Sequence, residues 1–137
     1  MTIYDDLGGE TGVRALVDRF YDLMHEKPEA AVIRKMHATS LDGSRDKLFW
    51  FLSGWLGGPQ LFIEKRGHPR LRMRHLPFAV DDAARDAWML CMRQALHEHR
   101  VDGKAIDNET REQLDDALWK LADHMRNDTP KGLKLVE

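Results

Sequence analysis

The sequence contains a single cysteine, Cys91, among its 137 residues. An internal disulfide is therefore impossible, and we expect a protein of the reducing cytoplasm. The sequence also has no apolar run near the roughly 18 residues of a membrane span and no signal-peptide pattern, so we expect no association with membranes. Its formal net charge of −2 gives no general attraction to nucleic acid or to anionic lipid.

Internal repeats and low-complexity segments are also absent from the sequence. A chain of this length, with 42% hydrophobic and 32% charged residues, has the size and composition of one ordinary globular domain. We therefore expect a single domain over residues 1–128, followed by a flexible tail over residues 129–137.

No segment alternates between apolar and polar residues for long enough to predict a β-sheet, whereas helical periodicity is strong. Pro28 is expected to end the first long helix, and the hydroxyl of Ser44 is expected to cap the helix that follows it. Asp81 or Asp82 should cap the next one. The pattern predicts an all-α fold with helices over residues 11–27, 29–36, 45–56, 82–99 and 108–125.

The segment from Gly57 to Phe78, with the sequence GGPQLFIEKRGHPRLRMRHLPF, differs from the helices around it. Two glycines and a proline end the preceding helix, and a run of cations follows before His75. Pro77 predicts that His75 lies at the end of a short helix, because the backbone before a proline avoids the helical region. We expect the rest of the segment to be irregular, and a long irregular segment inside one domain indicates either a functional role or a wrong assignment of its secondary structure.

Most of the seven histidines have an ordinary explanation. A solvated side chain is expected for the four on the charged sides of predicted helices, namely His25, His97, His99 and His124. His68 precedes Pro69 in a turn and is expected to be structural or to contact an anion. His37 and His75 remain, and a neutral imidazole is a common metal ligand.

Large apolar side chains are numerous for so short a chain, with four tryptophans, five phenylalanines and seven methionines, most of them on predicted inner faces. A large flat apolar ligand would complete such a core, and carboxylates on that ligand would explain the cations before His75. Haem meets both conditions, because it combines an apolar macrocycle, two propionates and an iron that takes an axial imidazole. Since the sequence lacks a Cys-x-x-Cys-His motif, the haem b would be bound non-covalently.

Five short motifs in the chain are specific enough to compare with a known family: Gly8-Gly9, Phe20-Tyr21, Gly57-Gly58-Pro59, GHPRLRMRHLPF from Gly67 to Phe78, and Ala87-Trp88. Through these motifs the chain closely resembles the truncated haemoglobins, in particular their second group, over nearly its whole length. The resemblance implies a globin-like two-over-two helical sandwich that encloses a b-type haem.

The resemblance also implies roles for individual residues. His75 would be the proximal iron ligand. A distal ligand would be stabilised by Tyr21, Trp88 and His37. The distal pocket would be lined by Ser44, Leu48 and Phe20. The macrocycle would be packed by Phe51, Leu52, Leu71, Phe78, Met92 and Leu118. The propionates would be bound by Lys47, Arg66 and Arg74.

The expected function is the binding of O2, nitric oxide and CO at an iron held by one imidazole. Distal hydrogen-bond donors of about 1 kcal/mol or somewhat more each would slow O2 release. Slow release favours redox chemistry, such as oxidation of nitric oxide to nitrate or reduction of peroxide, with a reductase that restores ferrous iron. O2 storage or transport without turnover is an alternative, and a haem-free helical protein whose basic loop binds phosphate is another. We expect a monomer or a weak dimer.

Overall fold

The structure is a computed structural model that describes residues 2–127, and nearly all its regular secondary structure is helical, as predicted. The tail predicted for residues 129–137 lies outside the described residues. The elements in chain order are α1 (Ile3–Asp6), α2 (Gly9–Glu26), the 3-10 helix η1 (Pro28–Ala30), α3 (Ala31–Lys35), α4 (Asp42–Trp55), α5 (Leu61–Arg66), α6 (Leu71–His75), α7 (Asp82–Glu98), β1 (Arg100–Val101), β2 (Lys104–Ala105) and α8 (Asn108–His124).

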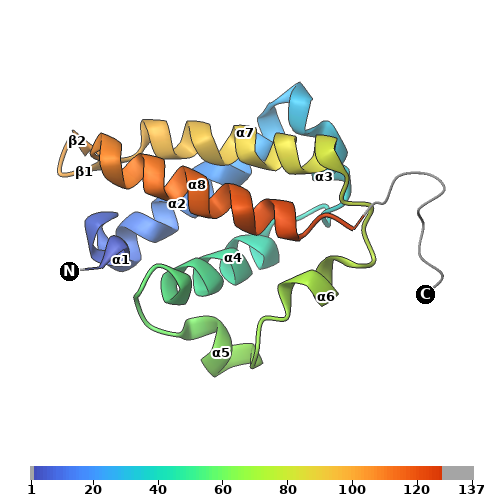
Figure 1. The fold of residues 1–137 in the computed structure, drawn as a ribbon, viewed down its shortest axis with the longest axis horizontal. Coiled ribbons are helices and arrows are strands. Elements are labelled where there is room, and N and C mark those ends of the chain that lie inside the picture. Colours follow the sequence, from blue (N-terminus) through green and yellow to red (C-terminus); the bar gives the residue numbers. More distant parts are fainter. Residues whose placement is uncertain (1, 128–137) are drawn as a thin grey trace.

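The long helices form two antiparallel pairs, α2 with α4 and α7 with α8 (Figure 1). Helix α2 also packs against α7, which joins the two pairs into one core. The centre of this core consists of fully buried side chains of α2 and α7, among them Val13, Phe20, Met24, Met89 and Met92. The arrangement is the two-over-two helical sandwich expected from the sequence.

Two of the long helices begin at capping aspartates, and one of these, Asp81, is a cap that the sequence predicts. The carboxylate of Asp81 accepts from the backbone N–H of Ala84 at 2.8 Å, and that of Asp107 accepts from the N–H of Thr110 at 3.2 Å. The prediction of Ser44 as the cap of α4 is wrong, because this helix begins at Asp42 and Ser44 lies within its first turn. The hydroxyl of Ser40 instead accepts from the N–H of Asp42 at 3.2 Å.

Three further local predictions need correction. Residues 100–105 form a two-stranded antiparallel hairpin whose turn places Asp102 and Gly103 at positive φ values of 52° and 79°. The segment from Gly57 to Phe78 is less irregular than expected, since it contains both α5 and α6. His99 is buried rather than solvated, because its Nε2 lies 2.8 Å from the carbonyl oxygen of Leu7, which draws the end of α7 against α1.

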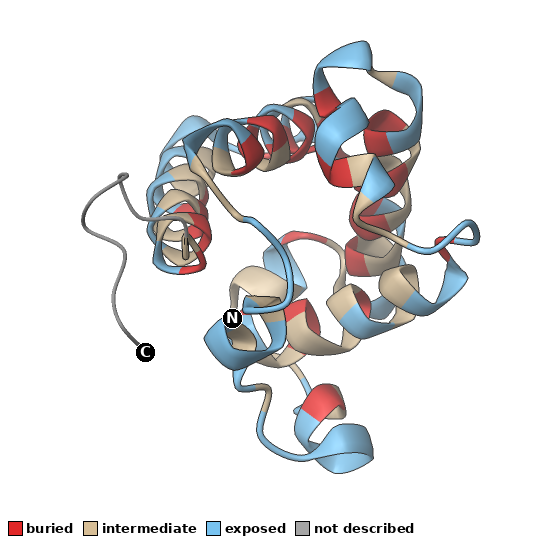
Figure 2. Ribbon diagram, turned by 90° about the vertical axis from the view of Figure 1, so that its right-hand side faces the viewer, coloured by how far each residue is buried: buried red, intermediate tan, exposed pale blue. Residues whose placement is uncertain are grey.

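Buried positions lie on the inner faces of the long helices, whereas the segment from α5 to α6 is mostly exposed (Figure 2). This segment runs beside α4 and returns to the start of α7 (Figure 1). Among residues 2–127, no helix combines the length and the apolar character needed to cross a bilayer.

Candidate functional site

A cavity of about 620 Å³ is lined by residues of α2, α4, α6, α7 and α8 and by the loop after α3. This volume is within the usual range for small-molecule and cofactor sites. The lining is mostly apolar and includes two histidines, a tyrosine, a tryptophan and several cations. The site residues expected from the sequence that line it are Tyr21, His37, Ser44, Lys47, Leu48, Phe51, Leu71, Arg74, His75, Phe78 and Trp88.

The other expected site residues do not line this cavity. Four of them belong to the close-packed core behind it: Phe20, Leu52, Met92 and Leu118. Helical periodicity shows that such residues point inward, but it does not separate a core contact from a cavity wall. Arg66 is exposed at the end of α5 and does not line the cavity.

His75 is the last residue of α6, as Pro77 predicts, and it lines the cavity in a half-buried position. Its Nδ1 lies 2.6 Å from the carbonyl oxygen of Leu71, one helical turn earlier. Because a carbonyl oxygen can only accept, Nδ1 must bear the proton. In a neutral ring the other nitrogen, Nε2, then keeps its lone pair, which is the form of imidazole that binds a metal.

Tyr21 and Trp88 reach the same cavity from α2 and α7, and Phe20 packs against both. The ring centroid of Phe20 lies 4.9 Å from that of Tyr21 and 5.0 Å from that of Trp88. Burial raises the pKa of Tyr21 above its ordinary value, although the nearby charge of Arg45 and a hydrogen bond with Ser44 oppose this. The phenol therefore stays protonated, and both rings offer a hydrogen-bond donor.

His37 lies in the loop after α3, with its ring centroid 5.8 Å from that of Tyr21. Its Nδ1 lies 2.8 Å from the carbonyl oxygen of Ile33 and must therefore bear the proton. Burial lowers the pKa of His37, and the charges of Arg34 and His75 act in the same direction, although the bond to Ile33 opposes them. Neutral His37 thus presents an unprotonated Nε2. In the neutral form, it is not the third hydrogen-bond donor expected from the sequence.

Cations lie at the side of the cavity formed by α4 and α6. Lys47 and Arg74 line it, and the guanidinium of Arg74 lies 5.3 Å from the ring centroid of Phe62. Arg85, which the sequence did not single out, lines it from α7 and forms an ion pair with Asp123 at 2.7 Å. These positive groups beside an apolar space suit a ligand with an apolar body and carboxylate groups.

Several other lining residues were not assigned to the site from the sequence: Ile33, Met36, Ala38, Phe62, Val80, Ala84, Leu121, Ala122 and Met125. The helical periodicity marks many of them as inward-facing, which is the only signal that could have found them. Phe62 belongs to α5, in the segment expected to be irregular, so no periodicity was available there.

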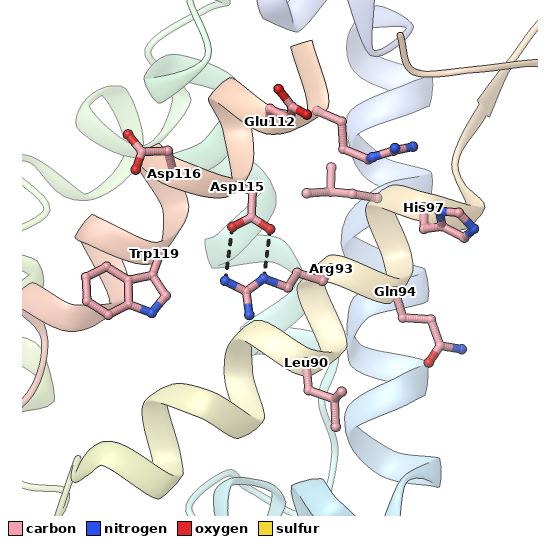
Figure 3. Close-up of a pocket in the computed structure, with 10 residues that line it drawn as sticks. Leu90, Arg93, Gln94, His97, Glu112, Asp115, Asp116 and Trp119 are labelled. Carbon is pink, nitrogen blue, oxygen red and sulfur yellow. Dashed lines mark hydrogen bonds and ion pairs between the residues drawn. The ribbon is translucent and has the colours of Figure 1, made fainter. Parts of the chain in front are cut away.

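A second hollow lies between α7 and α8, and its character is different. Figure 3 shows Arg93 of α7 facing Asp115 of α8, and two hydrogen bonds of 2.7 and 3.0 Å join them. Further charged residues, Glu112 and Asp116, line the same hollow. Leu90 and Trp119 also line this hollow, but it is more open than the first cavity, and the carboxylates of Glu112, Asp115 and Asp116 disfavour a ligand that itself carries carboxylate groups, so the first cavity is the candidate site.

The first cavity fits haem by the chemistry of its lining. It is largely apolar, it contains an imidazole with a free lone pair, and it has cations on one side. Within residues 2–127 no three histidine, cysteine, aspartate or glutamate side chains gather to hold a bare metal ion. An iron at His75 would therefore need the four nitrogens of a macrocycle. Together with the two-over-two helices, this site defines a globin-type haem protein.

Comparison with known proteins agrees with this class. Residues 2–127 match the family model described as bacterial-like globin. The chain is 37% identical over 121 residues to the group 2 truncated haemoglobin YjbI of Bacillus subtilis (strain 168), covering 88% of this chain and 86% of that protein.

Two solved structures are also similar to the chain. The group II 2-on-2 haemoglobin of Agrobacterium tumefaciens has a TM-score of 0.87 and 42% identity, covering 94% of this chain and 96% of that one. The truncated oxygen-avid haemoglobin of Bacillus subtilis has a TM-score of 0.80 and 35% identity, covering 93% of this chain and all of that one.

The chain belongs to the truncated haemoglobins, and within them to group II. As a member of this family it binds haem b without a covalent link and takes O2 as a gaseous ligand.

Proposed function

We propose that the protein binds O2 with high affinity at a pentacoordinate haem held by His75, and that it uses this oxygen in redox chemistry on nitric oxide or on reactive oxygen species. The observation that supports this most is the meeting of Tyr21 and Trp88 in the cavity that His75 also lines. These two donors come from different helices and share a packing contact with Phe20. The oxygen-avid character named for the similar Bacillus subtilis structure is consistent with the proposal.

Haem, when bound, would supply an iron that an imidazole of the chain holds and that takes a diatomic ligand. The chain contributes His75 as that imidazole, with the bond to Leu71 fixing the tautomer. Tyr21 and Trp88 would donate hydrogen bonds to a ligand in the cavity. Such bonds are stronger in a cavity from which apolar side chains exclude water.

Lys47 and Arg74 are the candidates for binding the propionates, because both line the cavity and both are cations. Leu48, Phe51, Leu71 and Phe78 would pack on the apolar macrocycle from α4, α6 and the loop after α6. Neutral His37 presents a lone pair rather than an N–H, so we assign the donor role to Tyr21 and Trp88 alone.

Slow O2 release suits a reaction that consumes oxygen in place. Nitric oxide, O2 and one electron together give nitrate, and a one-electron reductase would supply a new electron for each further turnover. The lone thiol of Cys91 is buried, and burial raises its pKa, so it stays protonated and unreactive. Such a protein suits the reducing cytoplasm, where a reductase of this kind can act.

The role of His75 is tested by absorption spectra of ferric, ferrous and oxygenated protein. We expect His75→Gly to lose or shift the Soret band, whereas His68→Gly should leave it in place. His68 is a matched control, because it is exposed on the same segment and does not line the cavity. An unaltered spectrum in His75→Gly would remove the basis of the proposal.

The redox role is tested separately by mixing the oxygenated protein with nitric oxide and measuring nitrate. We expect about one nitrate per haem in a single turnover, and continued production when a reductase and its electron source are added. Oxygenated protein that binds O2 tightly but yields no nitrate, and does not consume peroxide, would leave storage or transport of O2 as the function.

A further inference from the structure

The helix that contains His75 has little packing of its own. α6 is five residues long, contains no buried residue, and follows Arg70, whose backbone is left-handed with φ of 45°. So short a helix is not stable in water by itself. Contacts from outside α6 must therefore determine where His75 lies, and the structure shows two sets of them at the C-terminal end of α8.

The first set comes from Asn127, which follows the end of α8. Its side-chain amide donates to the carbonyl oxygen of His75 at 2.9 Å. Its side-chain oxygen accepts from the backbone N–H of Val80 at 3.0 Å, and its own backbone N–H donates to the carbonyl of Val80 at 3.0 Å. Asn127 therefore binds both ends of the stretch that joins His75 to the start of α7.

The second set comes from Arg72, three residues before His75 on α6. One terminal nitrogen of its guanidinium donates to the carbonyl oxygens of His124 and Arg126, each at 2.7 Å. Carbonyl groups at a helix C-terminus have no partner within the helix and lie at the negative end of its dipole, so they suit a cation. α6 is thus hydrogen-bonded to the C-terminal end of α8 at two points, the side chain of Arg72 and the carbonyl oxygen of His75.

We propose that the C-terminal end of α8 sets the orientation of the His75 imidazole, with Asn127 and Arg72 as positioning residues. The inference depends on the proposed role of His75 as the iron ligand. The imidazole is bonded to the carbonyl of Leu71, and so its direction follows the backbone of α6. Hydrogen bonds of Arg72 and Asn127 hold that backbone against the C-terminal end of α8. Groups that orient a ligating histidine in this way tune the metal without touching it.

The test uses the holoprotein with Asn127→Ala and, independently, Arg72→Gln. The matched controls are Asn108→Ala and Arg111→Gln, a hydrogen-bonded pair at the opposite end of α8. Resonance Raman spectra of the ferrous, ligand-free protein measure the iron–histidine stretching band. Transfer of haem to an excess of apomyoglobin measures how firmly haem is retained, and circular dichroism checks the fold.

We expect Asn127→Ala and Arg72→Gln to shift or broaden the iron–histidine band and to speed haem transfer by at least about 5- to 10-fold each, because each variant removes two hydrogen bonds and the loss of one would give a change of this size. The controls should match the unmodified protein in both measurements. A band and a transfer rate unchanged in Arg72→Gln and in Asn127→Ala would overturn the inference. Arg72 is exposed, so Arg72→Gln keeps the test available if Asn127→Ala does not fold.

The positioning inference and the proposed function fail in different ways. If His75→Gly retains the original iron–histidine band, His75 is not the ligand and both proposals fall. If His75→Gly loses the band but neither positioning variant moves it, only the role of Asn127 and Arg72 is overturned.

Discussion

Replacement of Tyr21 by phenylalanine separates a ligand contact from a structural role. The side chain of Tyr21 is 6% exposed, and its ring packs edge-on against Phe20. Phenylalanine keeps the ring and its contacts and removes only the hydroxyl. Ser44 acts on this hydroxyl and lowers the pKa of Tyr21, and we expect the loss of that interaction in Tyr21→Phe to lower the free energy of unfolding by only about 1 kcal/mol.

The effect on O2 release should be larger than the effect on stability. A hydrogen bond to a charged group contributes about 1.5–3 kcal/mol, and the outer atom of the ligand is partly negative in a cavity of low polarity. At about 1.4 kcal/mol for each factor of ten, the loss of this bond corresponds to O2 release roughly 10- to 150-fold faster. Association should change much less, because the ring still occupies the same space.

Stopped-flow measurement of O2 dissociation, with CO as the replacing ligand, provides the assay. Tyr4→Phe is the matched control, since Tyr4 is the only other tyrosine of the chain and does not line the cavity. A dissociation rate within about twofold of the unmodified protein, or an equal change in Tyr4→Phe, would refute the hydrogen-bond reasoning.

Three further changes concern stability. Gly12→Ala should lower the free energy of unfolding by about 3 kcal/mol or more, because the new Cβ would lie 1.8 Å from the backbone oxygen of Leu7. Urea unfolding measures this change. Gly43→Ala is the control, because a Cβ at Gly43 would have no heavy atom within 4 Å. His99→Ala should cost about 2 kcal/mol by thermal or urea unfolding, because it removes the buried partner of Leu7 and leaves a small cavity. Asp123→Asn should destabilise the protein at neutral pH but progressively less below pH 3.8, because hydrogen bonds from two arginines lower the pKa of this carboxyl.

The sign of the Asp123 effect follows from its partners, Arg126 and Arg85. A carboxyl with a lowered pKa in the folded protein contributes stability above its unfolded pKa, and that contribution is lost as the pH falls through the folded value. The difference in the free energy of unfolding between the unmodified protein and Asp123→Asn should therefore shrink on acidification, and a difference constant from pH 7 to 3 would contradict the assignment.

For His99, the exposed neighbour His97 provides the control, and a loss of stability as large in His97→Ala would argue against a specific bond.

Much of the fold was accessible from the sequence because the long helices show clear periodicity and clear caps. The errors lie where local signals compete. Ser44 looked like a cap, but the first turn of a helix tolerates Gly43 and so the helix begins earlier. The hairpin was missed because its strands have two residues each, although the Asp102-Gly103 pair is a known turn signal.

The candidate site was accessible in part for a different reason. His75, Tyr21 and Trp88 were found through motifs that resemble a family, and the cavity brings all three together. The sequence could not predict which of the inward-facing residues line the cavity. Met92 and Leu118 have the same helical periodicity as the lining residues but face the core. The donor state of His37 depends on the position of one carbonyl oxygen, which only the folded backbone supplies.

Phe20 does not line the cavity, yet its ring packs against both proposed donors, Tyr21 and Trp88. A smaller residue in place of Phe20 would keep both donors, Tyr21 and Trp88, but would leave room for their rings to rotate or tilt. Ligand kinetics in group II truncated haemoglobins could therefore diverge through substitutions behind the pocket, between proteins whose distal residues are identical.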